Sequence, residues 1–144
     1  MERLAVYGTL RARFGRHREL GLEHALVPLG ACRIAGRLVD LDAYPGLVPG
    51  DGLVEAELFG IRDARVLARI DAYEGYEPAR PERSLFTRRW VRLARPSLGA
   101  WVYAYARDAT GRAVVASGCW ASHVAAAPRY SNVSRERGRP PGPL

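Results

Sequence analysis

The feature that most limits the fold of this chain is its division into short apolar runs, broken every few residues by glycine, proline or aspartate. Only one stretch, from Val66 to Tyr73, clearly repeats apolar residues at the helical spacing of three to four. Asp63 before it is a candidate N-cap, and Gly75 after it is a natural C-terminal stop. The chain is therefore expected to form many short strands and one central helix.

Five segments have the pattern expected of strands. Leu4–Tyr7 is a short apolar run stopped by Gly8, which is typical of a buried strand opening into a tight loop. In the other four, larger side chains alternate with charged or small ones, which indicates strands whose two faces have different surroundings. These four are Ala31–Leu41, Leu53–Ile61, Phe86–Leu93 and Ala100–Tyr105.

Turn residues separate several of these segments. Tyr44-Pro45-Gly46 and Pro49-Gly50-Asp51-Gly52 predict two turns around a short Leu47-Val48 segment. A further turn is predicted at Asp108–Gly111. The polar stretch Gly15–Glu23 predicts a loop or a short surface helix.

Many strands with one helix indicate an α+β fold and not alternating βαβ units. The last strand has one face made of Ala100, Val102 and Ala104, and such small side chains suit a compact, closed or strongly curled sheet with a narrow interior. A length of 144 residues fits one domain. We expect this domain over residues 1–127, followed by a loosely held basic tail rich in proline and glycine over residues 128–144.

The chain is strongly basic, but its basic residues are scattered. All 22 are arginine, against 15 acidic residues, for a net charge of +7. A basic chain invites a nucleic-acid or membrane function, yet no readout motif accompanies these arginines. Cys32 and Cys119 are too few and too far apart for a zinc site or a disulfide framework, and the three histidines lack metal-ligand spacing with them. We therefore expect no metal site and no specific nucleic-acid partner.

The apolar segments also bear on localisation. No basic segment followed by a long apolar one begins the chain, as a secretory signal would require. No apolar run approaches the roughly 18 residues of a membrane span. The sequence predicts a soluble, cytoplasmic protein with no membrane partner, either a monomer or a weak homodimer.

Six short motifs follow one another along the chain. They are Val6-Tyr7-Gly8-Thr9-Leu10, Tyr44-Pro45-Gly46-Leu47, Ile70-Asp71-Ala72-Tyr73-Glu74-Gly75-Tyr76, Phe86-Thr87-Arg88, Ala100-Trp101-Val102-Tyr103 and Ser117-Gly118-Cys119-Trp120. Each is a weak signal alone, but in this order and spacing they resemble the γ-glutamyl cyclotransferase superfamily. The resemblance covers about residues 4 to 121. It is to the small branch related to γ-glutamylamine cyclotransferase and the plant avirulence-induced proteins.

The resemblance implies a β-barrel-like fold flanked by helices. It also implies an enzyme that turns a γ-glutamyl amine or amide into 5-oxoproline and the free amine, without a cofactor. In this family a Tyr-Gly-Thr-Leu loop cradles the glutamyl group through backbone N–H groups, and the glutamate of an Asp-x-x-Glu-Gly segment is the acid and base. These roles carry over to Tyr7, Gly8, Thr9 and Leu10 for substrate binding, and to Glu74 for catalysis.

Four more residues are candidates for substrate binding. Tyr44, Pro45 and Gly46 form the second motif, although the same residues are also typical of a plain turn. Arg88 is a candidate for contacting a substrate carboxylate, since similar proteins often have arginine there. An arginine on a strand is otherwise most often a solvated surface residue.

An acid–base role for Glu74 agrees with the reaction that the resemblance implies. The substrate α-amine rests as an ammonium ion and must lose a proton before it attacks its own γ-carbonyl. One carboxylate can take that proton and return it to the leaving amine. Ring closure is intramolecular, so the protein has mainly to fold the substrate and stabilise the oxyanion. The negative end of the helix dipole and partial burial should raise the pKa of Glu74 toward the working range.

Two other functions stay open from the sequence. One is a non-catalytic domain of this fold that binds a metabolite or a protein, and the other is a basic accessory protein that binds nucleic acid. The released amine could be an amino acid, a polyamine, a cross-linked lysine or an intermediate of natural-product assembly. Cys119 stands where similar proteins commonly have aspartate, and we expect this change to alter the polar contacts of a loop and not the reaction.

Overall fold

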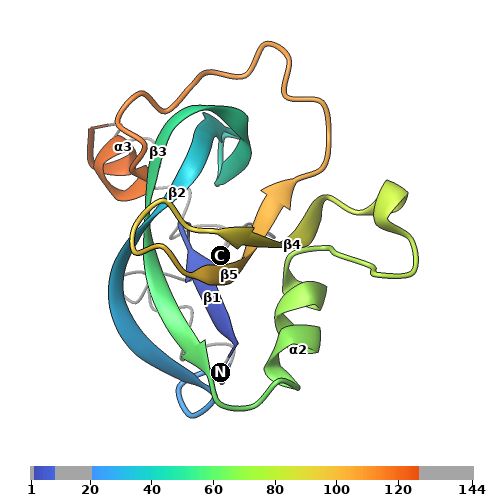
Figure 1. Ribbon diagram of the computed structural model, residues 1–144. Helices are drawn as coiled ribbons and strands as arrows, with labels where there is room; N and C mark the ends of the chain where they lie inside the picture. The colour runs from blue at the N-terminus through green and yellow to red at the C-terminus, as the bar shows by residue number, and fades with distance from the viewer. Residues whose placement is uncertain (1, 9–20, 127–144) are drawn as a thin grey trace.

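The computed structural model describes residues 2–8 and 21–126, and the strands within them form one sheet (Figure 1). The strand order is β2-β3-β1-β5-β4, with all neighbours antiparallel except β1 and β5, which are parallel. The five strands are β1 (Arg3–Val6), β2 (Leu26–Asp40), β3 (Pro45–Ile61), β4 (Phe86–Arg92) and β5 (Gly99–Tyr105). The described residues also form the helices α2 (Val66–Tyr73) and α3 (Trp120–Ala126) and the short 3-10 helix η2 (Pro81–Arg83).

The sheet curls until its two edge strands meet. The Arg33 N–H of β2 donates to the Arg95 carbonyl, just after β4, at 2.8 Å, and the Arg33 carbonyl accepts from the Ala94 N–H at 2.9 Å. We call the line between β2 and β4 the seam. These bonds close it at one point and turn the sheet into a small barrel. The predicted α+β fold with a curled sheet is confirmed.

Two apolar clusters lie on the two faces of the sheet. The helix-side cluster lies between the sheet and α2; it includes Leu4, Phe59, Ile70, Phe86 and Tyr103. The barrel cluster fills the interior, and α3 covers it through Trp120; it includes Tyr7, Ile34, Val54, Leu58 and Val102. In Figure 1, α2 and α3 accordingly lie on opposite sides of the strands. Alternation along β5 produces this division, because successive side chains of a strand point to opposite faces.

β3 is longer than predicted, because Pro49–Gly52 does not end it. Val48 pairs with Arg37 and Leu53 pairs with Ala35, so four residues of β3 lie opposite the single Gly36 of β2. The predicted turn at Pro49–Gly52 is therefore a bulge within a continuous strand. The predicted turn at Tyr44–Gly46 is shifted: β2 and β3 are joined by residues 41–44, and Pro45 already belongs to β3.

α2 ends as predicted but begins later. Arg65 and not Asp63 occupies its N-cap. The Asp63 carboxylate accepts a 3.0 Å hydrogen bond from the Arg65 backbone N–H in the turn before the helix. Glu74 is the C-cap, and Gly75 follows with φ of +67°, a conformation that glycine adopts without steric cost. Most of the Gly15–Glu23 segment and the tail from residue 128 onward lie outside the described residues.

Candidate active site

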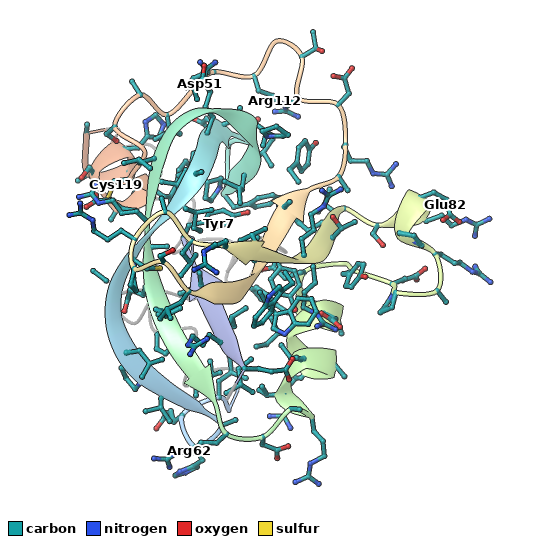
Figure 2. The ribbon with its side chains drawn as sticks, viewed as in Figure 1. Tyr7, Asp51, Arg62, Glu82, Arg112 and Cys119 are labelled. Carbon is teal, nitrogen blue, oxygen red and sulfur yellow. The ribbon has the colours of Figure 1, made fainter. Side chains whose placement is uncertain are left out.

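Tyr7 lies just beyond the end of β1 and joins three strands through its side chain. Its hydroxyl donates to the Tyr103 carbonyl of β5 at 2.5 Å and accepts from the Leu47 N–H of β3 at 3.2 Å. The residue is fully buried, and Figure 2 shows it in the interior of the molecule. Burial, and next the charge of Glu74, raise the pKa of Tyr7 well above its usual value. The phenol therefore stays protonated and keeps donating over the physiological range.

Glu74 is fully buried at the C-terminal end of α2. Leu67, Ile70, Asp71 and Glu74 follow the spacing i, i+3, i+4, i+7 and are all buried, so α2 turns this stripe toward the sheet. The charge of Glu74 adds to burial in raising the pKa of three tyrosines, which are Tyr7, Tyr44 and Tyr103. The glutamate therefore lies among tyrosines from the end of β1, from the β2–β3 turn and from β5.

A second buried carboxyl, Asp71, is held by two neighbouring side chains. Arg88 of β4 donates to it twice, from Nε at 2.8 Å and from Nη2 at 3.2 Å. The Tyr103 hydroxyl donates to Asp71 Oδ1 at 2.5 Å. The Arg88 guanidinium in turn lies 4.4 Å from the centroid of the Trp101 ring. Paired hydrogen bonds from guanidinium to carboxylate are strong and fix orientation, so Asp71 anchors the last turn of α2 to β4 and β5.

The two carboxyls of α2 are thus suited to different tasks. The oxygens of Asp71 accept hydrogen bonds from Arg88 and Tyr103. Glu74, three residues later, faces the tyrosine-lined region beside Tyr7. A proton-transfer group needs access to substrate, whereas a salt-bridged carboxylate is stabilised in its charged form. The geometry therefore distinguishes the two carboxyls, because Asp71 is held by Arg88 and Tyr103 whereas Glu74 lies among the tyrosines.

The second motif packs β3 against β5. A Cβ added at Gly46 would lie 2.9 Å from Leu41 Cδ1 and 3.1 Å from Tyr105 Cβ, so a side chain at this position would force its neighbours to shift. Tyr44 packs against Phe86, with ring centroids 6.1 Å apart. Burial raises the pKa of Tyr44, and the charges of Tyr105 and Glu74 add to this. Tyr44 therefore lies close enough to Glu74 to feel its charge.

The structure brings only part of the predicted site together. Tyr7, Tyr44 and Glu74 interact electrostatically. Gly8 is buried directly after Tyr7, and Pro45 and Gly46 are buried at the start of β3. Arg88, the candidate for contacting a substrate carboxylate, donates both of its hydrogen bonds to the Asp71 carboxylate. Thr9 and Leu10 lie outside the described residues.

Sequence reasoning missed Asp71 and Tyr103 as members of the site. A signal for Asp71 was present: it is one of two acidic residues within the apolar stripe of α2, and an acidic residue facing a core needs a partner. Tyr103 lies on the aromatic face of β5 and gave no comparable signal, since aromatic residues on a strand usually pack.

The described residues contain neither a cluster of metal-ligating side chains nor a membrane-spanning helix. Within residues 2–8 and 21–126, no group of three or more histidine, cysteine, aspartate or glutamate residues could hold a metal ion. Over the same residues, no helix is long and apolar enough to cross a membrane. Cys32 and Cys119 are both buried free cysteines.

Comparison with known proteins supplies an independent line of evidence. Residues 4–122 match the model of the family described as "Gamma-glutamyl cyclotransferase, AIG2-like". The γ-glutamylcyclotransferase family protein ytfP of Citrobacter rodentium is 34% identical over 119 residues, 82% of this chain and 94% of that protein. The YtfP protein of Escherichia coli K12 is 31% identical over 118 residues, 82% of this chain and 95% of that protein.

Solved structures agree with the fold. The solution structure of protein ytfP from Escherichia coli is 29% identical and matches with a TM-score of 0.63, covering 84% of this chain and 97% of that one. The crystal structure of an uncharacterised protein from Pyrococcus horikoshii is 22% identical and matches with a TM-score of 0.64, covering 90% of this chain and 98% of that one. The second likeness is one of fold alone.

Proposed function

Because the chain belongs to the γ-glutamyl cyclotransferase, AIG2-like family, we propose that it cleaves a γ-glutamyl amine or amide and releases 5-oxoproline and the free amine. The observation that carries this proposal is the position of Glu74. Its carboxyl group is fully buried among three tyrosines, at the end of a helix that Asp71 ties to the sheet. A buried carboxyl held on a rigid element is suited to proton transfer.

The reaction needs one group that can both accept and return a proton. The Glu74 carboxylate takes a proton from the substrate α-ammonium. The freed amine nitrogen attacks the γ-carbonyl carbon, and a five-membered ring closes with a negatively charged oxygen on the former carbonyl. The bond from that carbon to the leaving nitrogen then breaks as Glu74 returns the proton to this nitrogen. The ring nitrogen still carries a surplus proton, which Glu74 passes to the released amine, so the ring amide is neutral and the amine leaves as an ammonium ion. No water is consumed, and the carboxylate ends as it began.

The developing oxyanion and the glutamyl carboxylate both need hydrogen-bond donors. In this proposal they come from backbone N–H groups of the Tyr7–Leu10 loop, as the family resemblance implies. The absence of a Cβ at Gly8 lets a ligand approach this backbone closely. The Tyr7 hydroxyl is already engaged with Tyr103 and Leu47. We therefore assign it the task of holding the loop, and not a proton-transfer role.

The test is incubation of the purified full-length protein with a panel of γ-glutamyl amides and amines. We expect at least one to yield 5-oxoproline and free amine in equal amounts, with no loss of rate in the presence of a chelator. Release of glutamate in place of 5-oxoproline would overturn the proposal, because it would mean that water and not the α-amine attacks. Complete dependence on a divalent ion would also overturn it.

The extent of the active domain is a separate proposal. The family match ends at residue 122, which supports a functional domain within residues 1–127. We expect deletion of residues 131–144 to leave turnover within a few-fold of the full chain. Loss of turnover in a truncated protein that still unfolds cooperatively would mean that the tail contributes to the site.

A further inference from the structure

Away from Glu74, the seam between β2 and β4 opens into a groove of about 240 Å³. Among the described residues, the backbone hydrogen bonds that close the seam are those of Arg33 with Ala94 and Arg95. The residues lining the groove come from four strands. Its floor is formed by Ile34, Leu47 and Val102, which are buried members of the barrel cluster. The groove is thus a place where the apolar interior of the barrel reaches the surface.

Two exposed arginines, Arg89 and Arg92, line this apolar groove. Arg89 pairs with Val102 across β4 and β5, so its side chain is on the barrel face of the sheet, opposite to that of Arg88. Of the described residues that line the groove, none is acidic. Within the described part of the chain, the Arg89 guanidinium forms no ion pair or hydrogen bond. The second arginine, Arg92, donates from Nε to Ser97 Oγ at 2.9 Å.

This groove is distinct from the candidate active site. The Asp71 network lies on the helix side of β5, whereas Val102 and Ala104 line the groove from the other face of the same strand. Leu47 belongs to both regions, because it lines the groove and its N–H donates to the Tyr7 hydroxyl. The groove and the candidate active site are therefore separate places that are connected through Leu47.

We propose that the groove is a binding site for a small aliphatic carboxylate. The guanidinium of Arg89 offers paired donors to a carboxylate. The aliphatic chain displaces water from Ile34, Leu47 and Val102, which favours binding in proportion to the apolar area covered. The volume lies below the range of drug-sized pockets and suits a short chain. Positive charge beside an apolar floor, with no acid in the lining, selects an amphipathic anion over a cation or a neutral sugar.

A competing explanation of Arg89 makes a different prediction. A charged residue on the inward face of an edge strand prevents that edge from pairing with another copy of the chain. If this were its only task, replacing Arg89 would promote self-association and would leave carboxylate binding unchanged. The experiment therefore measures both properties in the same samples.

The test is an NMR titration of the ¹⁵N-labelled full-length protein with sodium hexanoate, with hexanol as the neutral probe of equal chain length, at constant ionic strength. We expect hexanoate to give saturable amide shifts at Ile34, Leu47 and Val102, and to bind at least about tenfold more tightly than hexanol. Arg89→Gln should weaken hexanoate binding by about tenfold, in line with the loss of a charged hydrogen bond, and leave hexanol binding unchanged. Arg89→Lys should retain part of the preference.

Arg62→Gln is the matched control, because Arg62 is an exposed arginine at the periphery and does not line the groove (Figure 2). It should bind hexanoate as the unmodified protein does. Equal binding of hexanol and hexanoate would overturn the proposal. So would unchanged hexanoate binding in Arg89→Gln, whether or not that variant self-associates, or shifts confined to residues around Asp71 and Glu74. None of these outcomes depends on whether the protein releases 5-oxoproline.

Discussion

The two faces of β5 are made by one seven-residue strand, yet they hold different kinds of residue. Toward α2, Tyr103 takes part in a network of buried polar groups with Asp71 and Arg88. Toward the barrel, Ala100 and Val102 pack in an almost wholly apolar cluster. Keeping charges out of water is costly and is done where a protein needs them. Substitutions on the helix side should therefore change chemistry, and those on the barrel side should change stability.

The largest effect is expected at Glu74. Glu74→Gln preserves size but cannot carry a proton, so kcat for 5-oxoproline release should fall by about 10²–10⁴-fold or more. The free energy of unfolding should stay equal or rise slightly, because a carboxylate at a helix C-terminus opposes the dipole. Both are measured on one sample, by product release and by urea unfolding.

The control is Glu82→Gln, an exposed glutamate on η2 at the edge of the molecule (Figure 2). This variant should retain full turnover. Near-normal turnover in Glu74→Gln would remove this residue from the mechanism and would abolish the contrast between the two faces.

A barrel-side substitution should show the reverse behaviour. Leu58→Ala removes a buried side chain from the barrel cluster, and such truncations cost about 2–5 kcal/mol of unfolding free energy. Turnover per folded molecule should be unchanged well below the unfolding transition. Leu53→Ala is the control, because Leu53 is 50% exposed. This substitution should change the free energy of unfolding by less than about 0.5 kcal/mol. A selective loss of kcat in Leu58→Ala would contradict the division of tasks.

Arg88→Met should affect both properties, because Arg88 connects the network to the rest of the sheet. Removing one partner of a fully buried ion pair costs about 3–5 kcal/mol, and the partial exposure of Arg88 should place this variant near the lower end. We expect kcat to fall about tenfold with little change in KM, since α2 loses an anchor one turn before Glu74.

A double variant tests the electrostatic origin of that loss. Asp71→Asn combined with Arg88→Met removes the unpaired charge while keeping an acceptor for the Tyr103 hydroxyl. It should be more stable than Arg88→Met alone. If the double variant is less stable than either single variant, the pair does not act as a unit.

The smallest effect is expected at Cys119, where a substitution should increase the free energy of unfolding and not lower it. Cys119 directly precedes α3, and its carbonyl accepts from the His123 N–H at 3.1 Å, so it occupies the N-cap position. A thiol is a poor acceptor for the free N–H groups of the first turn, and aspartate is a good one. Cys119→Asp should raise the unfolding free energy by about 0.5–1 kcal/mol and leave kcat unchanged. A fall in stability would show that the thiol packs and does not cap.

Much of the fold could be predicted from alternation, because the sheet has different surroundings on its two faces. Val54, Ala56 and Leu58 are buried between partly exposed Glu55 and Glu57, as their order in the sequence indicates. The closure of the barrel at Arg33 and Arg95 could not be predicted, since backbone pairing places no demand on these side chains. Pro49–Gly52 has the composition of a turn, and only the pairing of β2 on both sides of Gly36 makes it a bulge.

The site could be predicted less completely. The resemblance identifies Glu74, and the stripe of α2 indicates that this face is buried. The partner of Asp71 could not be predicted, because Arg88 is 17 residues away on another element and any nearby arginine could have served. The assignments of Thr9 and Leu10 stay predictions.

The parallel pairing of β1 with β5 has a consequence for how the protein is made. The Tyr7 hydroxyl and the Tyr103 carbonyl that it contacts are separated by 96 positions. A ribosome adding roughly 5–20 residues per second needs on the order of 5–20 s to synthesise that interval. During this time β1 has no β5 to lie against, and closing so long a loop slows folding further. In a nascent chain, β1 therefore stays without its β5 partner for several seconds. The candidate active site can form only when nearly the whole domain has emerged from the ribosome.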